Sequence, residues 1–255
     1  MKTRIDNQKL KYLAGTILLT VFLAACGGAG GQVQQSPLLA AFEKKIGTIA
    51  FIGLDGNVYT MDQAGKNLQA ISQDAQVPTE DDPNLTVYQE IAWTKDSQPQ
   101  AFTSMSQNTE SSSNPISASL YTSKVNQDGV PVKAFESDEE LPLYLYWSPN
   151  SQEIGFLTTT NARSAYILQR VGANGGEVNL VDVGSPYYWT WSPDSQQILT
   201  HAGGGVNNLF PDRIAFLDVR TNNVTEDLIG VVPGPFQSPA FSTDGQKILI
   251  GALNG

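Results

Sequence analysis

The chain has 255 residues, of which 40% are hydrophobic and 16% are charged, and its formal net charge is −10. This hydrophobic content is enough to fill a core, which excludes a disordered acidic chain. The negative charge disfavours nucleic acid and anionic lipid surfaces as partners.

The first 25 residues have the order of a secretory signal. Four basic residues lie within the first 11, and an uncharged run of apolar and small residues follows from 13 to 25. This order of basic region, apolar region and small residues before a cut is typical of a signal peptide. The run is shorter than the roughly 20 residues that span a bilayer. We therefore predict a signal peptide over residues 1–25; an ordinary secreted protein and an uncleaved helical anchor are the alternatives.

The apolar run ends in Leu23-Ala24-Ala25-Cys26, which contains the only cysteine of the chain. This tetrapeptide resembles the lipobox of bacterial lipoproteins. The resemblance implies that Cys26 receives diacylglycerol and becomes the mature N-terminus. Two or more acyl chains hold a protein stably on a membrane, at about 0.8 kcal/mol per buried methylene. We expect an extracytoplasmic protein, in the cell envelope or periplasm, whose N-terminal lipid makes the membrane a partner.

Residues 26–45 are expected to form a flexible tether, because Gly, Ala, Gln and Val dominate their first half without an apolar period. Folded structure is expected over residues 46–255. There, short apolar runs are separated by turn sequences such as Asp-Gly and Asn-Gly-Gly, and no long helical period is present. This pattern predicts an all-β domain.

One short motif recurs four times in this domain: an aromatic residue, Ser or Thr, any residue, Asp or Asn, Ser or Gly, then Gln. The aromatic anchors are Trp93, Trp147, Trp191 and Phe241, spaced by 54, 44 and 50 residues. Such spacing is close to the roughly 40 to 45 residues of a four-stranded propeller blade with loop insertions. Nine residues beyond each anchor a second strand is expected, at Phe102, Phe156, Thr200 and Ile250.

The chemistry of the motif predicts its structure. In Ser148-Pro149-Asn150-Ser151, proline suits the second position of a type I turn and asparagine the third. The aromatic residue before the turn ends the innermost strand, where it can pack between neighbouring blades. Burying one tryptophan removes about 150–250 Å² from water. We therefore expect all four anchors in the core, and not in a ligand-stacking row.

The repeat resembles the WD-repeat-like propellers typified by TolB, whose blades carry a Trp-Ser-Pro-Asp-Gly turn. The resemblance implies a β-propeller of four-stranded antiparallel blades. Residues 46–72 would supply the second to fourth strands of a first blade, and a fifth would begin at Gln237 and stop after two strands. Propellers close with 4 to 8 blades, so we expect an incomplete propeller and a chain that continues. The expected blades cover residues 46–72, 88–136, 143–184, 187–230 and 237–255.

Irregular connections are expected on one face of the blades, whereas short turns lie on the other. The irregular face would carry a Ser-rich loop from Ser104 to Ser117, expected to be mobile, and a Gly-rich loop from Ala202 to Asp212. It would also carry two acidic clusters: Glu80, Asp81 and Asp82, and Asp138, Glu139 and Glu140. These acids could receive a cationic peptide, a basic protein or a polymer; alternatively, they keep a tethered protein soluble.

Motifs for catalysis are not found, and neither a cofactor nor a metal is expected. The only histidine, His201, is expected to be exposed, and no Gly-x-Ser-x-Gly elbow occurs. Asp55-Gly56-Asn57 with Asp62 resembles part of a calcium loop, but Lys66 stands where the loop needs a bidentate Glu, and the sequence is what a hairpin turn requires. We expect a non-enzymatic scaffold that binds a protein or glycan partner. The alternative is the propeller portion of a larger secreted hydrolase resembling prolyl oligopeptidases. Lyases and quinone-dependent dehydrogenases on propellers are disfavoured, because they generally use several histidines.

Overall fold

The computed structural model describes residues 47–80, 82–96, 99–108, 116–124, 130–160, 165–203, 212–228, 230–231, 234 and 238–252. Every regular element in these ranges is a β-strand, as predicted. Accordingly, the described residues include no helix of the length and apolarity needed to cross a membrane. The predicted signal peptide, Cys26 and the tether lie outside the described residues.

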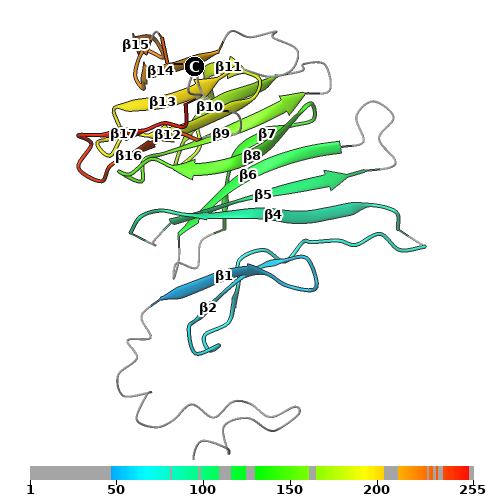
Figure 1. The fold of residues 1–255 in the computed structure, drawn as a ribbon. Coiled ribbons are helices and arrows are strands. Elements are labelled where there is room, and N and C mark those ends of the chain that lie inside the picture. Colours follow the sequence, from blue (N-terminus) through cyan, green and yellow to red (C-terminus); the bar gives the residue numbers. More distant parts are fainter. Residues whose placement is uncertain are drawn as a thin grey trace, which may run out of the picture. The chain divides into compact units, whose positions relative to one another are not determined.

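Within the described ranges, seventeen strands form five antiparallel sheets that follow one another along the chain (Figure 1). The first sheet contains β1 (Thr48–Ile52), β2 (Val58–Asp62) and β3 (Gln69–Ala70). The second contains β4 (Leu85–Trp93), β5 (Pro99–Gln107), β6 (Ile116–Lys124) and β7 (Val132–Ser137). The third contains β8 (Glu140–Trp147), β9 (Glu153–Thr160), β10 (Tyr166–Gly172) and β11 (Asn179–Gly184).

The fourth sheet contains β12 (Tyr187–Trp191), β13 (Gln197–Ala202), β14 (Arg213–Asp218) and β15 (Val224–Asp227), and the fifth contains β16 (Ala240–Phe241) and β17 (Ile248–Leu249). In each four-stranded sheet the spatial order of the strands is their order in the chain. These up-and-down sheets are the blades of a β-propeller, so the predicted fold class is confirmed.

The core lies between consecutive sheets. One cluster joins the first and second sheets through Val58 and Phe102; further clusters join the second to the third and the third to the fourth. Successive strand residues point to opposite faces. Ala101 and Phe102 are both fully buried, yet they belong to different clusters. A middle sheet therefore buries both faces, as expected when blades stack side by side.

The repeated motif closes the turn between the first two strands of a sheet through its side chains. In the fourth sheet, the N–H of Ser195 donates to the carbonyl of Ser192 at 2.9 Å. The Ser192 hydroxyl donates to Asp194 Oδ1 at 2.6 Å and accepts the Gln197 N–H at 2.9 Å. The hydroxyl of Ser192 is also the main reason why the pKa of Asp194 is lowered. The same bonds recur in the turns that begin at Ser148 and Ser242.

Two of the four aromatic anchors are in the core, as predicted. Trp147 and Trp191 are 8% and 6% exposed. Each also reaches the innermost strand of the preceding sheet: the indole N–H of Trp147 donates to the carbonyl of Ala92 at 3.2 Å, and that of Trp191 to the carbonyl of Tyr146 at 3.1 Å. Both acceptors lie one residue before the anchor of the preceding sheet, so the repeat carries an intersheet hydrogen bond as well as a turn.

The prediction is wrong for the other two anchors, because Trp93 and Phe241 are only half-buried. Trp93 faces the first sheet, in which no described strand has the innermost position. The ring of Phe241 lies 6.0 Å from that of Phe216 in the fourth sheet, and its own sheet has two described strands. For Trp93, the missing innermost strand leaves less sheet surface to cover the ring. The second strand of the last sheet also ends at Leu249, so Ile250 lies just beyond it.

Two expectations, about the Ser-rich loop and about His201, need correction. Ser104 and Ser117 lie within β5 and β6, so the Ser-rich connection is reduced to residues 108–115, of which 109–115 are outside the described residues. Of the Gly-rich loop, residues 204–211 are likewise outside. His201 is 3% exposed and therefore buried, because β12 and β14 flank it in the sheet. Its ring lies 5.4 Å from that of Tyr188.

Candidate binding cleft along the inner strands

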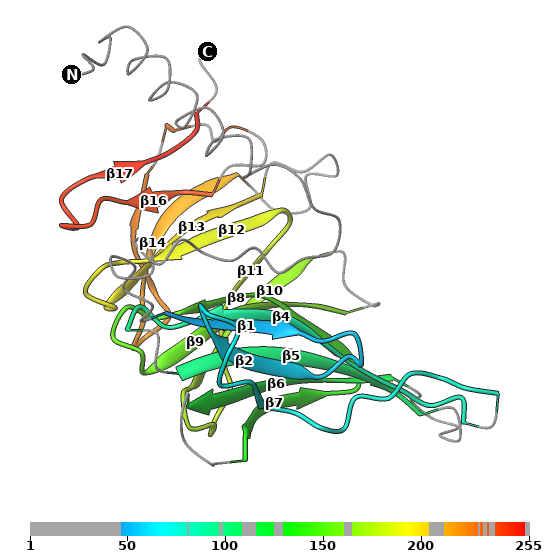
Figure 2. The same cartoon turned by 90° about the horizontal axis from the view of Figure 1, so that it is seen from below.

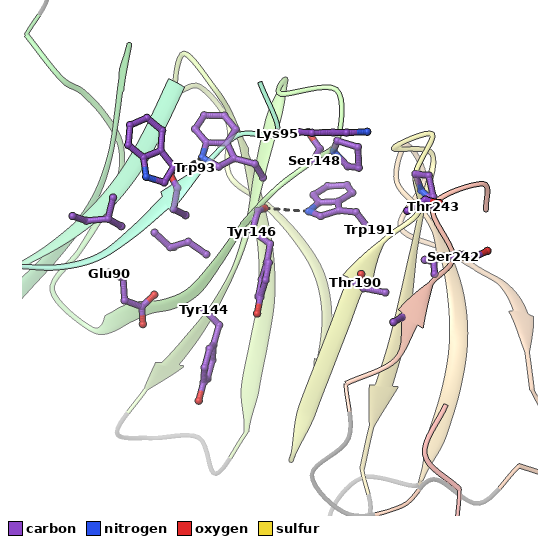
Figure 3. Close-up of a pocket in the computed structure, with 18 residues that line it drawn as sticks. Glu90, Trp93, Lys95, Tyr144, Tyr146, Ser148, Thr190, Trp191, Ser242 and Thr243 are labelled. Atoms are coloured by element: carbon purple, nitrogen blue, oxygen red, sulfur yellow. Dashed lines mark hydrogen bonds between the residues drawn. The ribbon is translucent and has the colours of Figure 1, made fainter. Parts of the chain in front are cut away.

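A cavity of about 770 Å³ runs along the innermost strands of four consecutive sheets, β4, β8, β12 and β16 (Figure 3). We call it the inner-strand cleft. Rings and hydroxyl groups dominate its wall. The aromatic residues that line it are Trp93, Tyr144, Tyr146, Trp147, Trp191 and Phe241. Among the described residues of the wall, two side chains are charged, those of Glu90 and Lys95. Such a mixture of apolar surface and few polar groups is typical of ligand sites.

Two β-bulges shape this wall. The pairing of β4 with β5 shifts register at Glu90, and that of β8 with β9 shifts between Leu143 and Tyr146. Glu90 and Tyr144 have positive φ angles of 35° and 52°. Such a backbone costs about 1–3 kcal/mol at a residue other than glycine and tends to occur at functional sites. A bulge redirects side chains; here Tyr144 lies in the cleft.

The two tyrosines of β8 present their rings to solvent. Tyr144 is 58% exposed and Tyr146 is 54% exposed. Tyr146 is held in place by the next sheet, because its ring packs edge-on against Trp189 with centroids 5.4 Å apart. Trp189 itself is 4% exposed. A buried indole thus supports an exposed phenol, which gives the cleft a rigid aromatic surface.

Glu90 is the one carboxylate among the described residues that line the cleft. Partial burial raises its pKa above the ordinary value of 4.5, although the backbone N–H groups of Tyr144 and Leu145 act in the opposite direction by stabilising the charged form. The carboxylate of Glu90, at the bulge of β4, is therefore close to the backbone at the bulge of β8. Glu90 is exposed and lines the cleft. It can accept hydrogen bonds from a ligand when it is ionised.

The raised pKa of Glu90 predicts a dependence of stability on pH. The pKa of Glu90 is about 4.5 in the unfolded state and higher in the folded state. At a pH between these two values, the folded state binds the proton more tightly than the unfolded state does. The Glu90 contribution to stability is therefore complete below pH 4.5 and falls as pH rises through the folded pKa. Glu90→Gln should remove this fall, so its free energy of unfolding should exceed that of wild type increasingly towards pH 7.

Urea unfolding of both proteins between pH 4 and 8 measures this difference. The exposed Glu139→Gln is the matched control, since it removes the same charge away from the cleft. If the curve of Glu90→Gln stays parallel to wild type across this range, the burial argument fails.

The structure places the predicted acidic residues away from the inner-strand cleft. Glu80 and Asp82 follow the first sheet, and Asp138 and Glu139 follow the second, in connections that lead to the next inner strand, whereas Glu140 is the first residue of β8. Asp81 lies outside the described residues. None of the five described acids lines the cleft. An acidic binding face and the cleft would therefore be different surfaces.

Two of these acids already have partners within the fold. Asp82 accepts hydrogen bonds from Gln76 Nε2 at 2.5 Å and from the Asn84 N–H at 3.0 Å, which order the connection. Glu140 accepts bonds from the side chains of Thr158 and Gln169. Asp138 and Glu139 remain exposed. Their carboxylates, together with that of Glu80, are the ones left free to face a ligand or water.

The sequence that resembles part of a calcium loop forms a hairpin turn in the structure. Asp55 accepts hydrogen bonds from the backbone N–H of Asn57 at 3.2 Å and from the hydroxyl of Tyr59 at 2.6 Å, and the Tyr59 bond is the main cause of its lowered pKa. These contacts stabilise the hairpin between β1 and β2. Across the part of the chain that the structure describes, no three His, Cys, Asp or Glu side chains group together as a metal site would require.

No protein-family model matches the sequence, and no curated protein matches it either. Solved structures with a similar fold include an oligogalacturonate lyase in complex with manganese (12% identity, TM-score 0.52) and dipeptidyl peptidase 4 from Porphyromonas gingivalis (10%, 0.53). TolB from Acinetobacter baumannii is another (15%, 0.45).

The alignment with the lyase covers 78% of this chain and 54% of the lyase chain. The corresponding shares are 73% and 31% for dipeptidyl peptidase 4, and 76% and 42% for TolB. The chain thus spans about half or less of the length of these proteins. Identities this low concern the fold alone. What the comparisons add is that the stacked sheets are arranged as in part of an oligogalacturonate lyase and of dipeptidyl peptidase 4.

Proposed function

We propose that this chain is a lipid-anchored extracytoplasmic β-propeller that acts as a non-catalytic scaffold for protein or glycan partners at the cell envelope. The observation that carries the proposal is the inner-strand cleft with its two exposed tyrosine rings, of which that of Tyr146 packs against the buried Trp189. Aromatic faces bind the apolar faces of sugar rings and of peptide side chains, while hydroxyl groups and Glu90 can orient polar atoms of the ligand. The stacked sheets keep these groups fixed.

The charged groups of the cleft favour binding over catalysis. Glycoside hydrolysis uses two carboxylates across the scissile bond, whereas Glu90 is the one carboxylate in the described wall. Covalent catalysis needs a nucleophile beside a base. The hydroxyls of Ser148 and Ser242 instead bond to Asn150 and Asp244 in their own turns. These observations support a role of the described cleft residues in recognition.

Binding can be tested with glycan and peptide arrays probed by the purified full chain. Tyr144→Ala and Tyr146→Ala should each weaken capture of the best array ligand about tenfold, because truncating an aromatic contact of an interface commonly costs 1–2 kcal/mol. Leu180→Ala is the control: its side chain is 53% exposed, close to that of Tyr146, but lies outside the cleft. Equal loss in all three variants, or none in any, contradicts the cleft.

The second candidate is the propeller portion of a larger secreted hydrolase. Its support is the fold shared with dipeptidyl peptidase 4 and with puromycin hydrolase, in which the matched region is 31% and 28% of those chains. Labelling of the native protein, purified from its own cells, with a fluorophosphonate probe distinguishes the two candidates. Covalent labelling of a serine favours the hydrolase.

Membrane anchoring through Cys26 rests on the Leu23-Ala24-Ala25-Cys26 sequence. Cys26→Ser should abolish incorporation of an alkyne-tagged fatty acid and move the protein from the membrane fraction to the soluble fraction of cell lysates. Ser36→Ala, in the predicted tether, should leave both unchanged. Retained labelling of Cys26→Ser would show that the lipid is attached elsewhere.

A further inference from the structure

A cavity separate from the inner-strand cleft, with a volume of about 570 Å³, lies between the outer strands of the second and third sheets. The third sheet lies between the second and the fourth (Figure 2). We call this space the outer-strand cavity. All four strands of both sheets that enclose it are described, so its walls do not depend on an incomplete sheet. The residues that line it include Phe135, Glu136, Glu140, Ile167, Gln169 and Leu180.

Three polar side chains of the third sheet form a hydrogen-bonded triad at this cavity. The Thr158 hydroxyl donates to Glu140 Oε2 at 3.0 Å, and Nε2 of Gln169 donates to the same carboxylate oxygen and to the Thr158 hydroxyl. Thr158 is fully buried, whereas Gln169 is 8% exposed and lines the cavity. Glu140 also lines the cavity and is only half-buried, so a ligand in the cavity can reach its carboxylate.

The propeller fold does not require this triad, as the fourth sheet shows. By the spacing from the tryptophan anchors and by the strand register, Ala202 and Ala215 hold the positions of Thr158 and Gln169. The two alanines are 2% and 0% exposed. Burying a polar side chain carries a cost that alanine avoids, so a sheet packs well without these polar groups. In the third sheet they instead hold the carboxylate of Glu140 in one position.

The groups of the triad that remain unbonded among the described residues are acceptors. Both side-chain bonds to Glu140 engage Oε2, and no described residue donates to Oε1 of Glu140 or to Oε1 of Gln169. The other carboxylate of the wall, Glu136, accepts a bond from Lys133 Nζ at 2.6 Å, whereas Glu140 has no ion pair with a described cation. A positively charged hydrogen-bond donor therefore matches this end of the cavity.

The remainder of the wall is mainly apolar. Leu180 is 53% exposed and Val178 is half-buried, so both present apolar surface that a ligand can cover. Phe135 and Ile167 are buried in the same wall. Burying a hydrocarbon chain against such surface is favourable. The volume also lies in the range of small-molecule sites, roughly 300–1,000 Å³.

We propose that the outer-strand cavity binds a small aliphatic amine. Its ammonium group donates to Oε1 of Glu140, and its hydrocarbon chain covers Leu180 and Val178. Thr158 and Gln169 are positioning residues, because they orient the carboxylate. The net charge of −10 attracts such a cation to the protein. The outer-strand cavity shares no described residue with the inner-strand cleft, so the proposal is independent of ligand binding there.

NMR titration of the isotope-labelled full chain with hexylamine, hexan-1-ol and hexanoate tests the proposal. Hexylamine should shift the backbone amide signals of Val178 and Leu180 in a saturable manner. It should bind about tenfold more tightly than hexan-1-ol, because a hydrogen bond between two charged groups is stronger than one with a neutral donor. Hexanoate should not bind. Ethylamine should bind about tenfold more weakly than hexylamine, since it buries fewer methylenes.

Three variants examine the polar end of the cavity. Glu140→Gln should weaken hexylamine binding about tenfold and leave hexan-1-ol binding unchanged, since the variant keeps the size of the side chain and loses its charge. Glu139→Gln is the matched control: it removes the same charge from an exposed neighbour that does not line the cavity, and should leave both affinities unchanged. Gln169→Leu should lower the preference for hexylamine over hexan-1-ol about fivefold, whereas a merely structural role of Gln169 would weaken both ligands equally.

Four results would overturn the proposal. Equal affinities of the wild type for hexylamine and hexan-1-ol would show that the carboxylate is not used, even if Glu140→Gln fails to fold. Equal losses in Glu140→Gln and Glu139→Gln would reduce the effect to general attraction by an acidic surface. Tighter binding of Nα-acetyl-lysine methylamide than of hexylamine would assign the cavity to a side chain of a polypeptide. Nuclear Overhauser contacts of the Leu180 methyl groups with residues outside the described ranges, measured without amine, would show that the chain itself fills the cavity.

Discussion

Trp191→Ala is expected to lower the free energy of unfolding by about 3–5 kcal/mol, the range for deleting a large buried aromatic side chain. Trp191 is 6% exposed, and its indole donates to the carbonyl of Tyr146 in the preceding sheet. The substitution removes apolar contacts on both sides of an intersheet cluster and leaves that carbonyl without its donor. Chemical denaturation followed by far-UV circular dichroism measures the loss.

Trp93→Ala is the comparison that makes this prediction specific. Trp93 holds the same position in the motif but is half-buried and has no described acceptor, so its loss should cost clearly less than that of Trp191. Trp191→Phe should fall between them, because it keeps most of the ring surface and loses the hydrogen bond, worth about 1–3 kcal/mol. Equal losses for Trp93→Ala and Trp191→Ala would contradict the intersheet role of the indole.

Gly155→Ala is expected to destabilise the protein by about 1–3 kcal/mol through overpacking. Gly155 lies in β9 opposite Tyr146, and Trp189 of the next sheet packs directly over it. A Cβ at this position would lie 2.8 Å from Cζ3 of Trp189 and closer still to Cη2. Because the indole is buried, it has little room to move away. Thermal unfolding should show a lowered Tm.

A double-mutant cycle isolates this contact. In Trp189→Phe the far ring of the indole is absent, so adding Gly155→Ala should cost much less than it does in wild type. Gly47→Ala is a control at a glycine whose Cβ would meet only the flexible side chain of Gln63. If Gly155→Ala costs the same in both backgrounds, the clash with Trp189 is not its cause.

Much of the fold can be predicted from the motif, because its parts act locally. The Ser192 hydroxyl and the Asp194 carboxylate close a turn with residues at most five positions away. The turn sets the end of one strand and the start of the next, and the spacing of the anchors then indicates four-stranded units. Burial of Trp147 and Trp191 follows, since both faces of a stacked sheet are covered.

The cleft could not be predicted in the same way, because it depends on irregularities. Tyr144 and Tyr146 alternate with Leu143 and Leu145, which reads as an ordinary half-buried strand. Both tyrosines are exposed and alternate with the buried Leu145, but the bulge that shifts the pairing of β8 with β9 between Leu143 and Tyr146 is marked by no residue type in the sequence. The bulge at Glu90 in β4 is likewise unmarked.

The half-burial of Trp93 and the deep burial of His201 were missed for another reason. Both depend on which strands flank a residue, and this is a property of the assembled sheets. The local sequence around His201, with three following glycines, resembles a loop, yet the histidine is the fifth residue of a central strand. The exposure of both side chains is therefore set by the neighbouring strands and not by the residues next to them in the sequence.

The direction of the indole hydrogen bonds bears on how the protein is made. Ala92 and Tyr146, which supply the acceptor carbonyls, precede their donors Trp147 and Trp191 by 55 and 45 residues. On a ribosome, therefore, each sheet emerges after the surface that it must contact has already been synthesised. Such a chain can add its sheets in sequence order during translation, each new tryptophan docking on a finished template.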